Sequence, residues 1–278
     1  MNIMARLDKT TALEQLVADV SRSSKYRDIC PELISSIGAQ ELEKRRNLKE
    51  AIKATKNKLH QVGGAYLDGR DHLADWQAVL QQAMTTGQAE QIKQACRHLM
   101  GYHASTRERL PILDVFYSTL FSQLPPIHSI VDIACGLNPL ALPWMPLSES
   151  YTYYAYDIYQ NMMDFLASYF ELMHIEGHSH ARDVVRSSPT QPVDLALVLK
   201  VLPCLEQLDK QAAHQLLHTI NARHIVVSYP IQSLGGKSKG MASYYEEHFK
   251  RLVEADNWLV HRLEFATELV FLIDTCPA

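Results

Sequence analysis

The 278-residue sequence lacks the marks of a membrane, secreted or metal-binding protein. It has no apolar run of about 18 residues, the length needed to cross a bilayer. Its first residues include Arg6, Asp8 and Lys9 where a secretory signal would have an apolar core. The five cysteines are odd in number and widely scattered, and no pair has zinc or redox-dithiol spacing. These absences predict a cytoplasmic protein with free thiols and no bound metal.

A strong overall charge is also lacking, but the two parts of the chain differ in sign. Residues 1–110 contain 17 Lys and Arg against 13 Asp and Glu, whereas the remainder contains 10 against 18. A basic first part joined to an acidic remainder predicts that only the first part meets a polyanion.

The first hundred residues have the apolar spacing of helices and contain no convincing strand. Leu13, Leu16, Val17 and Val20 recur at helical intervals, and Gly63-Gly64 ends a later helix. The further helices are expected over 40–61, 71–84 and 88–101. We therefore predict an N-terminal helical domain over residues 1–104.

From residue 125 onward short apolar strands alternate with helices, which predicts βαβ units and a parallel sheet. The strands are expected over Ser129–Cys135, Tyr151–Ile158, Ala181–Val185, Leu195–Val201 and Ile225–Tyr229, and the helices over 161–174, 207–220 and 241–256. Two last runs, Trp258–Phe265 and Leu269–Thr275, are joined by too few residues for a crossover helix, so they must be antiparallel. The predicted fold class is α/β, with residues 105–278 as a class I methyltransferase domain: a Rossmann-like, mostly parallel seven-stranded sheet that ends in an antiparallel hairpin.

Glycine is scarce in the loop after the first expected strand, Val131-Asp-Ile-Ala-Cys-Gly-Leu-Asn-Pro139. A loop that cradles a pyrophosphate needs three glycines, as G-x-G-x-x-G, and only Gly136 is present. Ala134 and Asn138 stand where a methyltransferase loop would have other glycines. A sulfonium cofactor has no phosphate and tolerates a bulkier loop, while Asp132 could orient the loop or approach the cofactor's amino-acid end. A plain strand-to-loop junction would have the same pattern.

Two more carboxylates end the following strands. Asp157 closes the second expected strand, where an acidic residue can accept hydrogen bonds from both ribose hydroxyls. Asp183 falls at the end of the third, where a carboxylate can bind an adenine amino group. Either one alone could cap a loop or helix. Together with Asp132 they favour a nucleoside site along the ends of successive strands.

A short helix is expected before the first strand. Ser105-Thr-Arg-Glu108 fits a capping box, which predicts a helix that begins at Ser105. Arg107 could then pair with the cofactor's carboxylate through two hydrogen bonds. The alternative is an ordinary exposed surface arginine.

Five segments, taken in order, carry a resemblance to a known family. They are His103-Ala-Ser-Thr-Arg-Glu-Arg-Leu-Pro111, Asp132-Ile-Ala-Cys-Gly-Leu-Asn-Pro139, Pro143-Trp-Met145, Leu199-Lys-Val-Leu-Pro-Cys-Leu-Glu206 and Ser233-Leu-Gly-Gly-Lys-Ser-Lys-Gly-Met241. Together they resemble the aminoglycoside-resistance 16S ribosomal RNA methyltransferases, which modify N7 of a guanine in the decoding A site. The resemblance implies S-adenosylmethionine as cofactor and the 30S ribosomal subunit as substrate. The expected cofactor contacts are His103, Arg107, Asp132, Ala134, Gly136, Asp157, Ile158, Asp183, Val184, Leu199 and Glu206.

The residues also bear on which atom is methylated. The Asn/Asp-Pro-Pro-aromatic motif of exocyclic-amine methyltransferases is absent after the fourth strand. Pro203-Cys204 leaves open pyrimidine C5 methylation through a thiolate, which needs a nearby cation such as Lys200. A packed thiol is the simpler interpretation. Guanine N7 needs only positioning, without a general base, and Met241 is expected to press the target base or to pack its helix.

The N-terminal part holds the expected RNA contacts. Lys44–Lys58 contains seven basic residues and one acid, and Gly235–Gly240 is a basic loop. The predicted RNA contacts are Arg45, Arg46, Lys49, Lys53, Lys56, Lys237 and Lys239. We predict a monomer that docks on 16S rRNA within the 30S subunit through residues 1–104. A solvated helix face, a small-molecule methyltransferase with a helical lid, and an RNA-binding module on an inactive fold are the alternatives.

Overall fold

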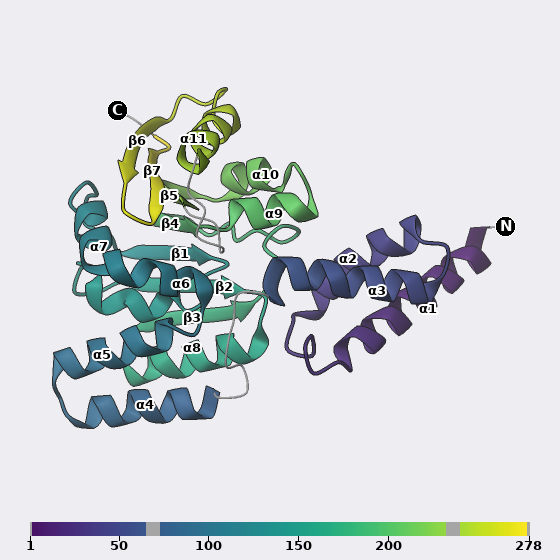
Figure 1. The fold of residues 1–278 in the computed structure, drawn as a ribbon, viewed down its shortest axis with the longest axis horizontal. Helices are drawn as coiled ribbons and strands as arrows, with labels where there is room; N and C mark the ends of the chain where they lie inside the picture. Colours follow the sequence, from purple (N-terminus) through teal and green to yellow (C-terminus); the bar gives the residue numbers. More distant parts are fainter. Residues whose placement is uncertain (1, 65–72, 232–239, 277–278) are drawn as a thin grey trace.

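A computed structural model describes residues 2–64, 73–231 and 240–276 of the chain, so Lys237 and Lys239 lie outside the described residues. Its centre is a seven-stranded sheet with the order β3-β2-β1-β4-β5-β7-β6 (Figure 1). The first five strands are parallel, and β7 pairs antiparallel with both β5 and β6. The strands are β1 (Ser129–Ile133), β2 (Thr152–Asp157), β3 (Glu176–Ala181), β4 (Val193–Leu199), β5 (Ala222–Pro230), β6 (Leu259–Glu264) and β7 (Glu268–Asp274). The predicted fold class is confirmed.

Alternating side chains of the central strands bury two separate cores, one on each face of the sheet. On one face, Ile130 and Leu195 pack in the same cluster as Phe165 of α8. On the other, Val131 and Ala196 pack with residues of α9, α10 and α11. Because both faces are covered, the central strands are apolar almost throughout. The helices of this part are α6 (Ala104–Arg109), α7 (Leu113–Phe121), α8 (Gln160–Leu172), α9 (Leu202–Leu208), α10 (Ala212–Thr219) and α11 (Met241–Leu252), with short 3-10 turns η3 (Leu110–Ile112) and η4 (Asn138–Trp144).

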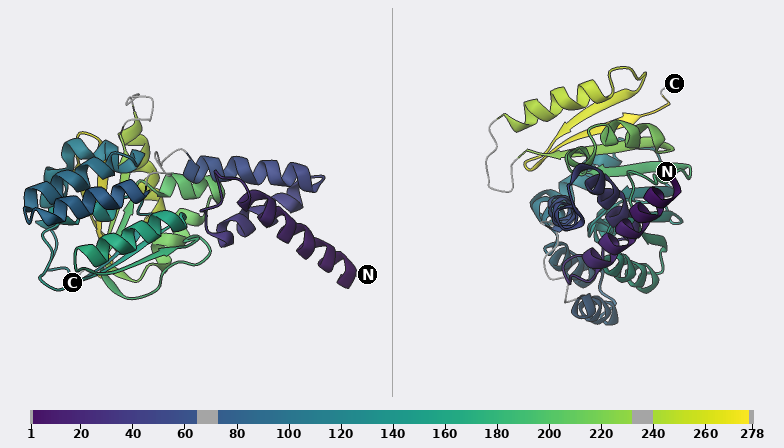
Figure 2. Two further views of the ribbon diagram at one scale, coloured as in Figure 1. Left: turned by 90° about the horizontal axis from the view of Figure 1, so that it is seen from below. Right: turned by 90° about the vertical axis from the view of Figure 1, so that its right-hand side faces the viewer.

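The N-terminal helices form two groups. The first comprises α1 (Asn2–Ser21), α2 (Pro31–Lys44), α3 (Leu48–Leu59) and a π-helical turn, η1 (His60–Gly64); it projects away from the sheet in two perpendicular views (Figures 1 and 2). The second, α4 (Leu73–Thr85) and α5 (Ala89–Met100), packs against the core: Trp76 lies edge-on to Phe165 of α8, with ring centroids 5.6 Å apart. The packing therefore differs between the two groups, and the domain boundary at residues 104/105 stays a prediction.

Three predicted elements are wrong in their bounds, each for a local reason. The helix expected over 40–61 is broken at Arg45, whose backbone is extended, and restarts after Asn47, whose side chain accepts a hydrogen bond from Glu50 N. The helix expected over 207–220 is broken by the extended Asp209. The third strand ends at Ala181 rather than beginning there, because Asp183 instead caps a turn by accepting from the backbone N–H groups of Val185 and Arg186.

Two expectations about the whole chain can be compared with this fold. All five cysteines are free thiols, and Cys30, Cys96 and Cys135 are buried. Among the residues that the structure describes, every helix is either too short or too polar to cross a bilayer.

Candidate cofactor and RNA site

A cavity of about 310 Å³ lies at the carboxyl ends of the parallel strands. Ala134 follows β1, Asp157 ends β2, Leu199 ends β4 and Pro230 ends β5, and all four line the cavity. This edge of a doubly wound sheet is where such folds bind their ligands. Helix α11 adds Met241 and Tyr245, and the N-terminal group adds Leu33, Val62 and Gly63.

The two carboxylates expected to hold a nucleoside both line this cavity. Asp157 accepts hydrogen bonds from Gly136 N at 2.9 Å and Ile158 N at 2.6 Å. Burial raises the pKa of Asp157 and the pKa of Asp183 above the ordinary value for aspartate. An ionised carboxylate can accept about four hydrogen bonds, so both retain capacity for ligand hydroxyl or amino groups.

In the loop after β1, Ala134 has a backbone conformation typical of the glycine that a methyltransferase loop would have at this position. Ala134 has φ +51°, the left-handed backbone conformation that glycine adopts most readily. Lys200, directly after β4, has φ +60°. Such strained conformations in non-glycine residues persist only where the surroundings enforce them, and they concentrate at functional sites. Gly136 has φ +54° as well, and a Cβ there would in addition lie 2.6 Å from Cε1 of His103.

Asp132 orients the loop and does not line the cavity. Its side chain is 1% exposed and accepts hydrogen bonds from Asn138 Nδ2 at 2.9 Å and Tyr153 OH at 2.7 Å. Burial raises the pKa of this carboxyl to about 6. Of the two roles considered from the sequence, the structure favours that of a residue that holds the loop.

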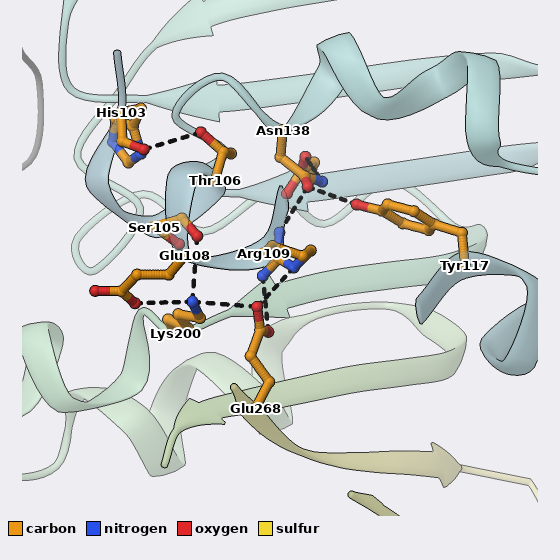
Figure 3. A network of polar contacts seen from close by, with 10 residues as sticks. His103, Ser105, Thr106, Glu108, Arg109, Tyr117, Asn138, Lys200 and Glu268 are labelled. Atoms are coloured by element: carbon orange, nitrogen blue, oxygen red, sulfur yellow. Dashed lines mark hydrogen bonds and ion pairs between the residues drawn. The ribbon is translucent and has the colours of Figure 1, made fainter. Parts of the chain in front are cut away.

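A network of charges includes two residues that line the cavity, Glu108 and Lys200, and extends into the core behind it (Figure 3). Glu268, at the start of β7, pairs with Arg109 Nε at 2.8 Å and with Lys200 Nζ at 3.1 Å. Lys200 Nζ also donates to Glu108 Oε2 at 3.0 Å and to the carbonyl oxygen of Ser105 at 3.1 Å. The network therefore fixes helix α6 to the carboxyl end of β4 and to the start of β7.

The same contacts correct the predicted capping box. Helix α6 begins at Ala104 with His103 as its N-cap residue, and no side chain caps it. Glu108 instead forms an ion pair with Lys200. The Lys200 side chain is buried and that of Glu108 is partly buried, so each charge needs the other as a partner. Arg107 is exposed and donates to the carbonyl oxygen of Gly101 at 3.2 Å. Its expected pairing with a cofactor carboxylate stays a prediction.

Most of the expected cofactor residues meet at one cavity. His103, Ala134, Asp157, Ile158, Asp183, Val184 and Leu199 line it, as does Met241. Arg107, Asp132, Gly136 and Glu206 do not line it, although Gly136 and Asp132 shape the loop around it. Glu206 instead pairs with His248 of α11 at 2.8 Å.

Sequence reasoning did not find the contributions of Leu33, Val62, Gly63 and Tyr245. The N-terminal group reaches the cavity because Cys30 N donates to the carbonyl oxygen of Ile158, and Gln160 N to that of Asp28. These backbone contacts join segments about 130 residues apart in the chain and leave no local pattern. Tyr245 could have been found, since helical spacing places it one turn after Met241.

The basic residues of the N-terminal group divide by their partners. Arg45 and Lys58 both pair with Glu41, at 2.8 and 3.0 Å, and Glu41 is 1% exposed. Burial opposes ionisation of Glu41, but Lys58 and Arg45 together lower the pKa of its carboxyl. Lys49 and Lys53 are exposed and Lys56 is partly exposed on α3, and within the described residues none of them has a carboxylate partner. Arg46, in the turn before α3, is exposed as well, and we call Arg46, Lys49, Lys53 and Lys56 the α3 basic surface.

Comparisons with known proteins identify the family to which a chain with this cavity belongs. Residues 22–272 match the family described as ribosomal RNA methyltransferase (FmrO). A 16S rRNA (guanine(1405)-N(7))-methyltransferase of Micromonospora rosea is 33% identical over 265 residues, covering 94% of this chain and 96% of that protein. One of Frankia casuarinae is 35% identical over 267 residues, covering 94% and 93%.

A solved structure gives the same result for the fold and the cofactor. The crystal structure of the 16S rRNA methyltransferase RmtF in complex with S-adenosyl-L-homocysteine has 29% identity and a TM-score of 0.81, covering 96% of this chain and 98% of that one. The predictions of family, enzyme class and cofactor are thus confirmed. With its cavity, its loop and its match over residues 22–272, the chain belongs to the FmrO family of S-adenosylmethionine-dependent ribosomal RNA methyltransferases.

Proposed function

We propose that this enzyme methylates N7 of guanine 1405 of 16S rRNA within the 30S subunit, as its relatives are named to do, and so confers aminoglycoside resistance. We further propose that it acts in the cytoplasm as a monomer. The observation that carries the proposal is the cavity that two buried carboxylates share with residues of the N-terminal helical group. A small-molecule methyltransferase has no use for a basic surface beside such a cavity, and an inactive fold has no need to keep the carboxylates.

The residues present fit S-adenosylmethionine. Asp157 would hold the ribose hydroxyls and Asp183 the adenine amino group, while Ile158 and Val184 add apolar walls. When bound, this cofactor supplies an electrophilic methyl group on a sulfonium. Asp157 also accepts from Gly136 N, so the same side chain that binds the ribose fixes the loop after β1.

The chemistry asks little of the protein beyond position. Guanine N7 carries an in-plane lone pair and needs no deprotonation, so no general base is required. Holding the two reactants in line and excluding water can supply much of the rate enhancement. We assign Met241 to the positioning of the target base, since it lines the cavity at the start of α11.

Docking would fall to the α3 basic surface, Arg46, Lys49, Lys53 and Lys56. Phosphate contacts position an enzyme on RNA without reading its bases. Helix α3 leads directly into η1, whose Val62 and Gly63 line the cavity, so RNA bound along α3 would reach the target site.

One assay separates the candidate functions. The protein is incubated with labelled S-adenosylmethionine and, in parallel, with 30S subunits, free 16S rRNA and small metabolites. Methylation of 30S subunits alone, mapped to guanine N7, is the expected result. Label in a metabolite would support the small-molecule alternative, and no transfer to any of the three would support an inactive fold.

The same assay tests the pyrimidine C5 alternative. Cys204 lines the cavity, but Lys200, the cation that could lower the pKa of its thiol, is engaged by Glu108 and Glu268. Cys204→Ala should therefore retain methylation. Loss of all activity in a folded Cys204→Ala protein, with a covalent RNA adduct in the wild type, would revive C5 chemistry.

Cofactor binding provides a direct test of the carboxylate assignment. Asp157→Ala should weaken S-adenosylmethionine binding by about 1–3 kcal/mol, because ribose hydroxyls and two backbone N–H groups lose their acceptor. Calorimetry measures the affinity, and Asp164→Ala, an exposed aspartate on α8, is the control. Equal affinities in the two variants would remove Asp157 from the site.

A further inference from the structure

A pair of stacked tyrosines forms the wall of the cavity on the β5 side. Tyr245 of α11 lines the cavity, and its ring lies over that of Tyr229 in β5 with centroids 4.7 Å apart and an angle of 21° between the planes. In the sheet, β1 and β4 separate β5 from β2 and β3, which carry Asp157 and Asp183. The aromatic wall and the carboxylate wall are therefore at different ends of one cavity.

The ring of Tyr245 is held in place from behind. Tyr229 is fully buried and lies edge-on to Phe249 and Phe271, which stack on each other with centroids 4.0 Å apart. A second contact fixes the helix itself, because His248 of α11 pairs with Glu206 of α9 at 2.8 Å. Tyr245 is therefore a preorganised surface, and binding against it would cost little side-chain entropy.

The neighbours of Tyr245 define what this end of the cavity accepts. Met241, Pro203, Leu205 and Pro230 line the cavity and offer no charge, and the charge of Lys200, which also lines it, is neutralised by Glu108 and Glu268. A flat ligand with broad apolar faces and polar edges suits such a wall, since aromatic rings stack on nucleobases with little regard to their hydrogen-bonding edges. The polar nucleoside part of a cofactor is better served at the carboxylate end.

We propose that Tyr245, backed by Tyr229, is the stacking surface that holds the plane of the methyl-accepting guanine base during transfer. The inference rests on the proposed function, because it assumes that a base enters this cavity. Methylation at N7 requires the ring plane to lie so that the in-plane lone pair meets the methyl group in line. A ring that stacks on the base fixes this plane without contacting N7 and without moving a proton.

Four variants test the proposal: Tyr245→Phe, Tyr245→Leu, Tyr245→Ala and Tyr244→Ala. Tyr244 is the matched control, because it precedes Tyr245 on the same helix but is 59% exposed, touches the Tyr245 ring only edge-on, with centroids 5.4 Å apart, and does not line the cavity. The measurements are the single-turnover methylation rate on 30S subunits at saturating enzyme, the affinity for 30S subunits and the calorimetric affinity for S-adenosylmethionine.

Stacking predicts a specific pattern across these variants. Tyr245→Phe should keep a rate within about 3-fold of the wild type, whereas Tyr245→Leu and Tyr245→Ala should be slower by about 10- to 100-fold, the range expected for one lost base–aromatic stack. Tyr244→Ala should be close to the wild type. Both affinities should stay unchanged, because phosphate contacts and carboxylates lie elsewhere; a merely structural role for Tyr245 would lower them together with the rate.

Three results would overturn the proposal. If Tyr245→Leu is as active as Tyr245→Phe, the residue is only an apolar wall, and this comparison decides even if Tyr245→Ala does not fold. If Tyr245→Ala has the wild-type rate, the ring does not contact the base. If it lowers cofactor affinity, the ring serves the cofactor instead. Mapping the nucleotide that the wild type methylates tests the proposed function separately, and if the acceptor differs, the four variants are compared on that acceptor.

Discussion

The buried charges beside the cavity and the exposed charges of α3 share a residue type but differ in their partners. Arg109 and Lys200 face Glu268 and Glu108, and Arg109 and Glu268 are fully buried. Lys49 and Lys53 stand in water, with no carboxylate partner among the described residues. A charge that is neutralised within the chain stabilises the fold, whereas a charge without a carboxylate partner is available to a polyanion. The partner, more than the position in the sequence, separates the charges that stabilise the fold from those that stay open to solvent.

Glu41 lies between these two classes and changes how they should be tested. It accepts from Arg45, one of the residues expected to contact RNA, and also pairs with Lys58. Reversing Arg45 would place an acid beside a buried carboxylate, so any loss of RNA binding would be mixed with damage to α2 and α3. The predictions below therefore leave Arg45 unchanged, and they run from the largest effect on folding stability to the smallest.

Removing the central anion of the buried network should have the largest effect. Glu268→Gln leaves Arg109 buried without the carboxylate that neutralises it and should lower the free energy of unfolding by about 3–5 kcal/mol. Urea denaturation followed by circular dichroism measures it. Glu264→Gln is the control, since Glu264 pairs with Arg262 on the surface of the same hairpin and should change stability by less than about 1 kcal/mol. Equal losses in both variants would place Glu268 among the ordinary surface charges.

Asp132 should make the free energy of unfolding depend on pH. Its pKa, raised by burial from 3.8 to about 6, means that the folded protein binds more protons than the unfolded chain between these values. Its contribution to the free energy of unfolding therefore falls as pH rises through this window, by roughly 3 kcal/mol in all, and stays low above it. Asp132→Asn abolishes that fall, so the difference between variant and wild type should shift in favour of the variant from about pH 4 to pH 7.

The slope of this difference is decisive for Asp132, because a constant offset reflects only the changed hydrogen bonds to Asn138 and Tyr153. Urea denaturation across the pH range gives the slope. Asp164→Asn, an exposed aspartate, should show none. A flat difference for Asp132→Asn as well would mean that its carboxyl titrates as an ordinary aspartate.

Glu41→Gln tests the intermediate class. It removes the negative charge that two cations share, replaces one of the two acceptor oxygens with an amide donor, and should cost about 1.5–3 kcal/mol of stability, the range for hydrogen bonds to charged groups. Binding to 30S subunits should not fall, because the variant frees Arg45 and Lys58 and adds no negative charge. Glu43→Gln, the exposed neighbour two residues on, is the control for both measurements. Loss of 30S affinity at unchanged stability would mean that Glu41 orients α3 for RNA and does little for the fold.

The sequence allowed the sheet and the carboxylates to be predicted for a common reason. Strand ends are local features, so Asp157, which ends β2, can be assigned to this edge from the sequence; Asp183 is assigned to it through a misplaced third strand and lies two residues after the end of β3. The break at Arg45 was missed because basic residues continue through it, and the helix boundary depends on the Asn47 cap and on Glu41. The strand β3 was misplaced because its outward residues are polar, including His178 and His180, and the apolar signal lies beyond it.

The parts of the site that could not be predicted come from distant contacts. Leu33 and Gly63 reach the cavity only because the N-terminal group docks on the segment after β2; a Cβ on Gly63 would lie 2.7 Å from Ile158 Cδ1 and from Tyr159 OH. The pairing of Arg109 with Glu268 spans 159 residues, and only the assembled sheet brings the two together. Such contacts follow from the tertiary structure and leave no periodic pattern.

The open charges of α3 should affect stability least and RNA binding most. Reversing Lys49 and Lys53 to Glu should change the free energy of unfolding by no more than about 0.5 kcal/mol, since both are exposed and without carboxylate partners in the described part of the chain. Binding to 30S subunits should nevertheless be lost or greatly weakened, and each lost phosphate contact should flatten the log–log dependence of affinity on salt by somewhat under one unit.

Lys210 and Arg223, reversed together, make the same change in net charge at other exposed positions and should leave binding nearly unchanged. If the control pair weakens binding equally, the RNA senses only the net charge of the protein. If neither pair changes the affinity or its salt slope, α3 is a solvated helix and docking belongs to another surface. Cofactor calorimetry on each variant completes the test, because an intact cavity together with lost 30S binding is the result that separates open charges from structural ones.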